Sequence, residues 1–307
     1  MRIVYMGTPE FAVPPFHALL AAGHEIAAVF TQPDKPQGRK MLLTPPPVKT
    51  AAEEAGVTVY QPGSLKGPVQ AERVASLAPD VIVVAAYGKI LPRTILGIPK
   101  YGCVNLHPSL LPKYRGASPI QAAVLNGDAE TGVTTMLMSE ACDEGDILFQ
   151  KPTPVGPDET TPELTERLSR LGAQLLVETL AALGGGSVSP KKQDTSRATY
   201  VSLVSKKMSP VDWTRTAREI HNQVRALVPW PVASAQIAGL RLKLYRARPL
   251  EHTSGEAGLV VPDGDGFVVC CGCGTALEIL EVQADGGKRM SGSDFLRGHP
   301  LRGKKME

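Results

Sequence analysis

The sequence predicts an α/β fold in which a doubly wound, mostly parallel sheet forms a first domain, followed by a smaller β-rich domain. Apolar runs of the kind that is buried in a parallel sheet lie at residues 1–7 and 80–86. Beyond residue 230 the pattern changes to short strands with Gly and Asp at the turns. With 307 residues, the chain is long enough for two ordinary domains.

The N-terminal stretch has the order strand, helix, strand. Residues 1–7 are apolar and end at a Gly, residues 8–14 lead into a helix, and residues 25–31 form the next strand. Parallel strands need such a crossover, so this stretch is the start of a βαβ unit. The first turn lacks the Gly-x-Gly-x-x-Gly pattern, and a nicotinamide cofactor is therefore not indicated.

A proline-rich segment follows at residues 32–49. It contains too many prolines for a helix and is long for a strand-to-helix connection, so we expect a surface loop. The segment carries Lys35, Arg39, Lys40 and Lys49, which suit contact with phosphates. Composition alone fits equally well a solvated loop whose basic residues have no special role.

A long helix is predicted over residues 161–183, because a Thr can cap its first turn and a Pro occupies the next position. Three consecutive glycines at residues 184–186 end it. The residues that follow are polar and irregular, as in a linker. We therefore predict a first domain at residues 1–188, a linker at residues 189–206 and a second domain at residues 207–307.

The second domain is predicted to be a small β-barrel of the oligonucleotide-binding type, preceded by a helix at its entrance. The reason is a series of short strands separated by Gly and Asp turns. The expected strands are residues 235–237, 242–245, 258–261, 266–269 and 277–282.

The two parts of the chain differ in charge. Residues 1–188 contain 15 Lys and Arg against 18 Asp and Glu, whereas residues 189–307 contain 18 against 12. In the second part, basic and apolar residues alternate with strand period, which places the basic ones on one face: Arg241, Lys243, Arg246 and Arg248. Such a face indicates a polyanionic ligand, although a merely solvated basic face has the same pattern.

Several classes of protein are disfavoured. No apolar stretch reaches the length of a membrane span and no secretion signal opens the chain, so we expect a cytoplasmic protein. The five cysteines are an odd number and scattered, so reduced thiols are expected. Cys270, Cys271 and Cys273 have no further ligands near them at metal-binding spacing, and we predict small buried residues and no metal site.

Three polar residues, Asn105, His107 and Asp143, form the strongest candidate for a reactive site. Asn105 and His107 follow a short apolar strand and lie two residues apart, so both point to one side of an extended segment. Asp143 follows a second β-like run at residues 132–138. Ligands of open α/β sheets bind at strand ends, so the three side chains can meet one bound molecule.

These residue types suit the transfer of a formyl group to an amine. The reaction needs a donor for the oxygen that becomes negative in the tetrahedral intermediate, which an Asn amide supplies, and a group that manages protons. A carboxylate favours the charged form of a nearby imidazole, so we expect the pKa of His107 to be raised towards or above neutral. No nucleophilic Ser or Cys is required, because the attacking nitrogen belongs to the substrate.

A single His near a strand end is more often structural than catalytic, but here it is part of a longer motif. Asn-x-His-Pro-Ser-Leu-Leu-Pro-x-x-Arg-Gly at residues 105–116, with Asp-x-Gly-Asp at residues 143–146, resembles the folate-dependent formyltransferase superfamily. The members that act on tRNA have Gly-Leu before this Asp and Thr after it, where this chain has Ala141, Cys142 and Glu144. That difference concerns the conformation of the loop more than its chemistry.

The resemblance implies a function and a set of site residues. Asn105, His107 and Asp143 would be catalytic, and 10-formyltetrahydrofolate would be the formyl donor. The residues implied in folate binding are Tyr87, Gly88, Ile90, Leu91 and Pro92, which border the pterin with backbone groups, and Ser109, Leu110, Leu111 and Pro112.

The resemblance extends to the proline-rich segment, which looks like the loop with which tRNA-acting members engage the acceptor end, and to residues 212–231 at the start of the second domain. It implies that formyl passes to the α-amino group of methionine on initiator tRNA. Initiator methionyl-tRNA and the folate are the expected partners, with no membrane or metal. The sequence does not determine the oligomeric state, and we expect a monomer.

Three other functions fit part of this pattern. A sugar-nucleotide N-formyltransferase would share the catalytic residues and could carry a second domain, but it does not need the basic segment and the basic strand. Formyltetrahydrofolate hydrolase would use water as the acceptor and has no evident need of a basic domain. A nucleic-acid-binding protein that has lost its chemistry would not be expected to retain Asn105, His107 and Asp143 together.

Overall fold

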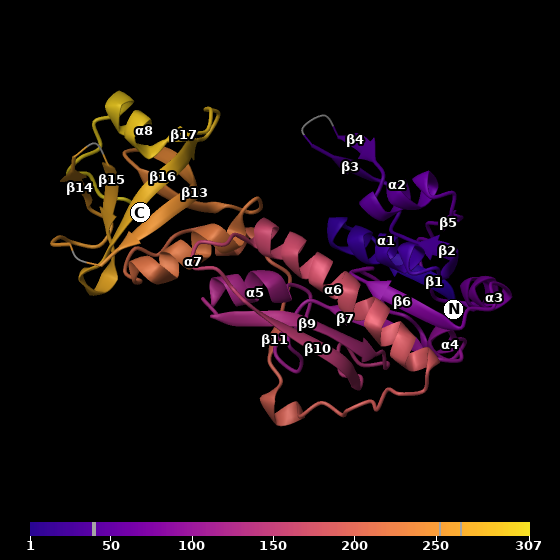
Figure 1. The fold of residues 1–307 in the computed structure, drawn as a ribbon. Coiled ribbons are helices and arrows are strands. Elements are labelled where there is room, and N and C mark those ends of the chain that lie inside the picture. The colour runs from indigo at the N-terminus through magenta and orange to yellow at the C-terminus, as the bar shows by residue number, and fades with distance from the viewer. Residues whose placement is uncertain (39–40, 252, 265) are drawn as a thin grey trace. The chain divides into compact units, whose positions relative to one another are not determined.

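The computed structural model describes residues 1–38, 41–251, 253–264 and 266–307. The chain divides into two compact units, each with its own sheet and core (Figure 1). The first unit consists of Met1–Pro119, Thr131–Pro154 and Thr165–Val201, and the second of Ile120–Glu130, Val155–Leu164 and Ser202–Glu307.

The first unit is built on a seven-stranded sheet with the order β10-β9-β7-β6-β1-β2-β5. Its strands are β1 (Arg2–Gly7), β2 (Glu25–Phe30), β5 (Val59–Tyr60), β6 (Val81–Ala85), β7 (Cys103–His107), β9 (Glu130–Leu137) and β10 (Ile147–Pro154). The pairs from β5 to β7 are parallel, and β9 runs antiparallel to β7. This confirms the expected mostly parallel sheet. The strand order reverses between β1 and β6, where such sheets bind ligands.

Helices cover both faces of this sheet. On one face, α1 (Val13–Ala21) packs with the Phe16 ring 5.6 Å from the Tyr5 ring. The same face carries α6 (Thr161–Gly184), whose Thr179 hydroxyl is 2.8 Å from that of Thr135 on β9. The opposite face packs against α3 (Pro68–Ser76) and α4 (Arg93–Leu96), which contribute Val74 and Ile95 to one buried cluster. The sheet is therefore doubly wound, as predicted.

The proline-rich segment is more regular than the expected loop. Strands β3 (Lys35–Gln37) and β4 (Leu42–Thr44) pair as an antiparallel ribbon, and α2 (Pro47–Glu54) begins within the segment. The prediction of an irregular loop was wrong here, because a Pro in the first turn of a helix does not interrupt its hydrogen bonds. Two of its predicted site residues, Arg39 and Lys40, lie outside the described residues.

The second unit contains an antiparallel sheet with the order β12-β13-β16-β15-β14. Its strands are β12 (Ala233–Ile237), β13 (Leu240–Leu250), β14 (Val260–Asp263), β15 (Gly266–Cys270) and β16 (Ala276–Ala284), and β17 (Met290–Ser291) pairs with β16. The unit also holds α5 (Pro119–Leu125), α7 (Ala217–Leu227) and α8 (Gly292–Gly298). Short 3-10 turns in the chain lie at Glu10–Ala12, Thr195–Arg197, Lys206–Met208 and Gly272–Gly274.

The C-terminal segment connects the two edge strands of this sheet. Backbone bonds of 2.7 and 2.8 Å join Glu307 to Gln236 on β12. The preceding residues bond to the other edge, where Met306 donates to Gly258 and Val260 of β14 donates to Lys304. The C-terminal segment thus pairs with backbone groups at both edges of the sheet.

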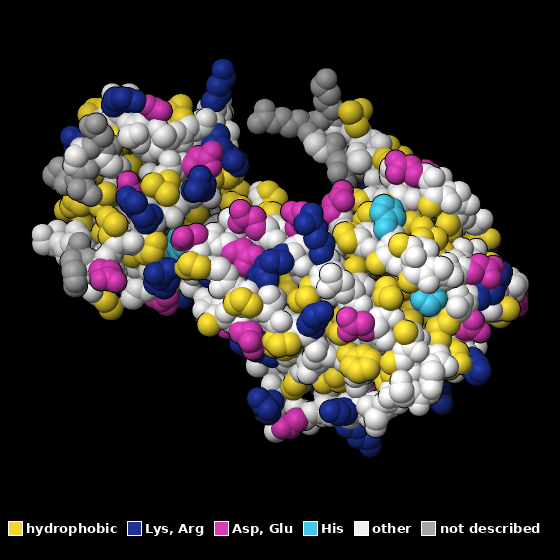
Figure 2. All heavy atoms as spheres, viewed as in Figure 1, with side chains coloured by type: hydrophobic (Ala, Val, Ile, Leu, Met, Phe, Trp, Pro, Cys, Tyr) yellow, Lys and Arg dark blue, Asp and Glu magenta, His cyan; other side chains and the backbone are white. Residues whose placement is uncertain are grey.

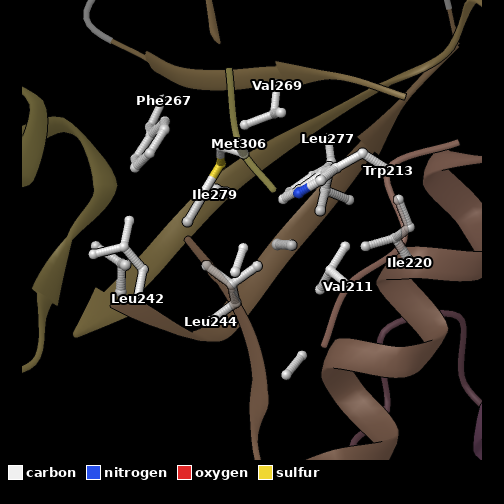
Figure 3. Packing of buried hydrophobic residues seen from close by; sticks show 14 of the residues in the cluster. Val211, Trp213, Ile220, Leu242, Leu244, Phe267, Val269, Leu277, Ile279 and Met306 are labelled. Atoms are coloured by element: carbon white, nitrogen blue, oxygen red, sulfur yellow. The ribbon is translucent and has the colours of Figure 1, made fainter. Parts of the chain in front are cut away.

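The core of the second unit lies between this sheet and α7. Trp213 and Ile220 point towards the strand residues Leu244 and Leu277, and Met306 of the C-terminal segment joins the same cluster (Figure 3). A capping box in which Thr216 and Glu219 bond to each other's backbone begins α7. Of the three neighbouring cysteines, Cys270 and Cys271 are buried as predicted, whereas Cys273 is exposed.

A β-bulge in β13 sets the direction of its basic side chains. Strict alternation from the buried Leu242 and Leu244 would turn Arg246 towards the core. The register between β13 and β16 shifts on both sides of Arg246, so that Arg246 and Arg248 are exposed and Ala247 is buried. The predicted basic face exists, but it depends on this bulge.

Candidate active site

Asn105, His107 and Asp143 come together in the first unit. β7 carries Asn105 and His107 on the same side, and both are buried. The Asp143 carboxylate lies beside them, with Oδ1 3.5 Å from Asn105 Nδ2 and 3.7 Å from His107 Nδ1. The sequence prediction that these three residues converge is thus consistent with the geometry. An amide donor and an imidazole both lie close to one carboxylate.

The hydrogen bond of His107 defines which ring nitrogen carries the proton. Its Nε2 lies 2.9 Å from the backbone oxygen of Tyr114, which can only accept, so Nε2 is protonated in the neutral ring. The lone pair of Nδ1 therefore faces the side of Asp143. At 3.7 Å the carboxylate is too distant for a direct hydrogen bond but close enough to stabilise a proton on Nδ1.

The expected direction of the His107 pKa was wrong. Burial lowers the pKa of His107 below its ordinary value, and the nearby Asp143 carboxylate and the Tyr114 carbonyl only partly oppose this effect. The expectation considered the carboxylate and not the desolvation of a side chain that is 4 % exposed. His107 is consequently neutral at pH 7 and able to accept a proton.

Asp143 is held in a constrained turn. Its backbone has a φ of 54°, in the left-handed region, and its Oδ2 accepts the backbone N–H of Gly116 at 2.8 Å. Gly116 has a φ of 110°, and a side chain there would meet the Val201 carbonyl. At Gly145 a Cβ would lie 1.6 Å from the Leu137 oxygen. The Gly positions of both motifs are thus explained by close backbone approach.

The loop after His107 is anchored through Thr134 of β9. The Thr134 hydroxyl donates to the Ser109 carbonyl at 2.6 Å and accepts the Leu111 N–H at 3.1 Å. Gln150 donates to the Leu111 carbonyl at 2.8 Å. The Leu111–Pro112 peptide is cis. The four residues predicted for folate binding here, Ser109, Leu110, Leu111 and Pro112, therefore lie in a fixed loop that follows β7.

The segment after β6 lies at the point where the strand order reverses. The Tyr87 carbonyl accepts bonds from the Thr8 hydroxyl at 3.0 Å and the Gln32 amide at 3.1 Å, and the Gly88 carbonyl also accepts from Gln32. Tyr87 and Leu91 point into the core, whereas the Ile90 side chain is 86 % exposed. Pro92 precedes α4. The Tyr87 ring is therefore buried and the Tyr87 and Gly88 carbonyls are bonded within the protein, whereas Ile90 is exposed.

The basic residues predicted to bind tRNA differ in their surroundings. Lys35 is exposed on β3, whereas Lys49 lies in α2 and forms an ion pair of 2.9 Å with Asp34. On β13, Lys243 lies 3.9 Å from Asp285, and Arg248 pairs with Glu278. The exposed Arg241 and Arg246 complete the set. Figure 2 shows basic side chains on the second unit interspersed with acidic ones.

Metal and membrane contacts receive no support from the part of the chain that the structure describes. Within the described ranges, no three His, Cys, Asp or Glu side chains gather as metal ligands do. No helix among the same residues is both long enough and apolar enough to cross a bilayer.

Three residues beside the candidate site received no individual role from the sequence, although one of them, Arg115, lies in the motif at residues 105–116. Arg115 lies in β8 (Arg115–Gly116), which pairs in parallel with β11 (Tyr200–Val201), and its side chain is 1 % exposed. It contacts Gln193 and Tyr200, which belong to the segment predicted to be a linker. Arg115 could have been indicated by its place in the motif at residues 105–116, whereas Gln193 and Tyr200 lie in a polar, irregular stretch that carries no comparable signal.

Comparison with known proteins identifies the family. Residues 1–180 match the family described as formyl transferase, and residues 203–300 match the formyl transferase C-terminal domain. The chain is 46% identical over 307 residues to the methionyl-tRNA formyltransferase of Methylococcus capsulatus, covering 100% of this chain and 99% of that protein. It is 48% identical over 303 residues to that of Moorella thermoacetica, covering 98% and 97%.

Solved structures share the fold at low identity. An N-formyltransferase from Helicobacter canadensis, in complex with folinic acid and dTDP-3-aminofucose, has a TM-score of 0.69 at 18% identity, with 92% of this chain and 98% of that chain covered. The sugar 3N-formyl transferase WlaRD, with dTDP and 5-N-formyl-THF, has a TM-score of 0.68 at 19% identity, with 92% and 97% covered. On the full-length similarity to its relatives, the chain belongs to the methionyl-tRNA formyltransferase family.

Proposed function

We propose that this protein transfers the formyl group of 10-formyltetrahydrofolate to the α-amino group of methionyl-initiator tRNA, for the initiation of translation. The observation that carries the proposal is the convergence of Asn105, His107 and Asp143, with the carboxylate 3.5 Å from the amide and 3.7 Å from the imidazole. These groups match the needs of formyl transfer to an amine. The relatives that align over the full chain carry this activity in their name.

The three residues divide the chemistry between them. The methionyl nitrogen attacks the formyl carbon, and the Asn105 amide donates to the oxygen that becomes negative. His107 Nδ1, which is unprotonated at neutral pH, accepts the proton that leaves the attacking nitrogen and returns one to the departing folate nitrogen. Asp143 stabilises the imidazolium that forms between these two transfers.

The folate is proposed to bind at the carboxyl ends of β1 and β6. Ligands of doubly wound sheets bind where the strand order reverses, and Tyr87, Gly88, Ile90, Leu91 and Pro92 follow β6 at that point. Their backbone groups offer donors and acceptors to a pterin ring. The loop that contains Ser109, Leu110, Leu111 and Pro112 follows the neighbouring strand β7, so both segments can contact one ligand.

The tRNA is proposed to contact both units. Lys35 of β3, with Arg39 and Lys40, which come a few residues later in the sequence, are here named the segment cations. They are proposed to bind phosphates of the acceptor end, with Lys49 supporting the segment through Asp34. The exposed basic residues of β13, Arg241, Lys243, Arg246 and Arg248, are proposed to bind phosphates elsewhere on the tRNA. Residues 1–188 then perform the chemistry, residues 207–307 hold the tRNA, and residues 189–206 join them.

The second unit is proposed to be a closed barrel of the oligonucleotide-binding type. In support, the C-terminal segment bonds to Gln236 at one edge of the sheet and to Gly258 at the other. A monomer located in the cytoplasm suits an enzyme of translation.

The acceptor can be tested directly. The protein and 10-formyltetrahydrofolate are incubated separately with methionyl-tRNA, free methionine and an amino-sugar nucleotide, and formylated product is measured. Formyl-methionyl-tRNA as the main product is expected. Formylation of the sugar nucleotide alone would favour a sugar-nucleotide N-formyltransferase, and release of formate without a formylated acceptor would favour a hydrolase.

A further inference from the structure

A buried arginine lies next to the proposed catalytic residues without a role in the proposed reaction. Arg115 is 1 % exposed, and its Nη1 is 3.1 Å from the Glu144 carboxylate and 2.9 Å from the Tyr200 hydroxyl. Its Nε and Nη2 both donate to Gln193 Oε1, at 3.0 and 2.9 Å. A charge removed from water needs such partners, and these come from the Asp143 loop and from residues 193–200, near the end of the first unit.

Gln193 connects Arg115 to the backbone of the Asp143 loop. Its Nε2 donates to the carbonyl of Asp143 at 2.8 Å and to that of Gly145 at 2.7 Å. Tyr200 donates to the side chain of Glu144 at 3.0 Å. One amide thus holds both ends of the turn from Asp143 to Gly145, and the residue in the middle of the turn is bound by Tyr200 and Arg115.

The support matters because the turn fixes an uncommon backbone conformation at Asp143. Asp143 has a φ of 54°, in the left-handed region, which Asp adopts more readily than most residues but less readily than Gly. This conformation directs its carboxylate to the Gly116 N–H at 2.8 Å and leaves it beside Asn105 and His107. If the two carbonyl bonds were lost, the backbone could relax to an extended conformation and the carboxylate would move away from His107.

We infer that Gln193 is a positioning residue for the Asp143 carboxylate, and that Arg115 and Tyr200 orient the Gln193 amide for this task. The segment around Gln193, predicted from the sequence to be a linker, then belongs to the first unit and supports the proposed catalytic residues. The inference rests on the proposed function, because it assigns to Gln193 an effect on formyl transfer.

Two substitutions of Gln193 test whether it positions the Asp143 carboxylate or only supports Arg115. Gln193→Glu keeps two oxygens for Arg115 but places a carboxylate against the carbonyls of Asp143 and Gly145, whereas Gln193→Leu removes all four bonds. Positioning predicts that both variants lower kcat by about tenfold to a hundredfold, as expected from losing bonds that orient a catalytic group. KM for 10-formyltetrahydrofolate should stay within about twofold.

Gln223→Glu is the matched control. Gln223 lies in α7 of the second unit, where its Nε2 also donates to two backbone carbonyls, those of Met208 at 2.8 Å and Pro210 at 2.9 Å. This control should lower Tm as much as Gln193→Glu does, but leave kcat unchanged. Wild-type kcat in Gln193→Glu would overturn the inference, because it would show that Gln193 serves only Arg115. Equal losses of kcat in Gln193→Glu and Gln223→Glu would also overturn it.

A second readout does not depend on turnover. NMR of protein with 13C-labelled histidine gives the chemical shift of His107, whose signal is assigned by its absence in His107→Gln. The variant Asp143→Asn shows how this chemical shift changes when the charge of Asp143 is lost. Gln193→Leu should move it in the same direction, and Gln223→Glu should not move it. An unchanged His107 signal in Gln193→Leu would refute the positioning role of Gln193, whatever the activity of the protein. A wild-type protein that formylates no methionyl-tRNA would refute the proposed function and leave this test of positioning intact.

Discussion

Removing the charge of Asp143 is expected to lower kcat by about a thousandfold. Two opposite charges 3.7 Å apart, as in protonated His107 and Asp143, attract by about 4 kcal/mol at an effective dielectric constant of about 20. Because His107 is charged only during the reaction, this energy acts mainly on the transition state, and about 4 kcal/mol corresponds to a factor of about 10³ in rate. Asp143→Asn keeps the shape of the side chain and removes the charge.

The assay is single-turnover formylation of methionyl-tRNA at saturating 10-formyltetrahydrofolate between pH 5.5 and 8.5. Activity requires neutral His107 and is lost as the pH falls through its pKa. Since Asp143 raises that pKa against the larger effect of burial, Asp143→Asn should lower it further. The loss of activity on the acid side should therefore occur at lower pH in the variant.

A neighbouring carboxylate provides the control. Glu140→Gln removes one negative charge from the same loop, but Glu140 is exposed and lies 3.5 Å from Arg93. Its kcat should stay within about twofold of wild type, since exposed ion pairs contribute little. A fall of less than about tenfold in Asp143→Asn, or a shift of its acid limb to higher pH, would refute the assignment of Asp143 as the group that stabilises the imidazolium.

Four further predictions each concern one residue or one group of residues. Asn105→Ala should lower kcat by about 10²–10³ with little change in KM for the folate, as expected when one oxyanion donor is lost, and steady-state kinetics check this. Replacing the segment cations Lys35, Arg39 and Lys40 by Ala should raise KM for methionyl-tRNA and leave folate binding unchanged. An unchanged KM would show that these basic residues have no role in binding tRNA. Arg241→Gln should reduce the slope of log affinity against log salt by about 0.7 to 0.9 if Arg241 contacts a phosphate, as equilibrium binding of labelled tRNA at several salt concentrations would show. Burial lowers the pKa of His221 to about 4. Below a pH of about 6.5 His221 binds a proton in the unfolded chain but not in the folded protein, so the folded protein loses stability as the pH falls. Thermal unfolding of His221→Gln at pH 7 and pH 5 should therefore show a smaller loss of Tm than wild type, and an equal loss would contradict a neutral buried His221.

Patterns that depend on neighbouring residues in the chain were predictable. The buried strands β1 and β6 are continuous apolar runs, and α6 begins and ends where its Thr, Pro and Gly residues indicate. Asn105 and His107 share one side of β7 because alternate residues of a strand do. Asp143 was identified from the motif around it, since no local rule places residue 143 beside residue 105.

Contacts between segments that are distant in the chain could not be predicted from these local patterns. The pKa of His107 depends on how completely the fold removes it from water, and the direction of Arg246 depends on a bulge that only pairing with β16 produces. Gln193 lies in a polar, irregular stretch and becomes important only because the chain returns to Asp143. The sequence by itself determined the buried strands and the long helix, because these follow from local periodicity and residue type, and its motifs supplied the residues of the candidate site. Tertiary structure alone decided burial, register and the partners of Arg115, because these energies arise between residues far apart in the chain.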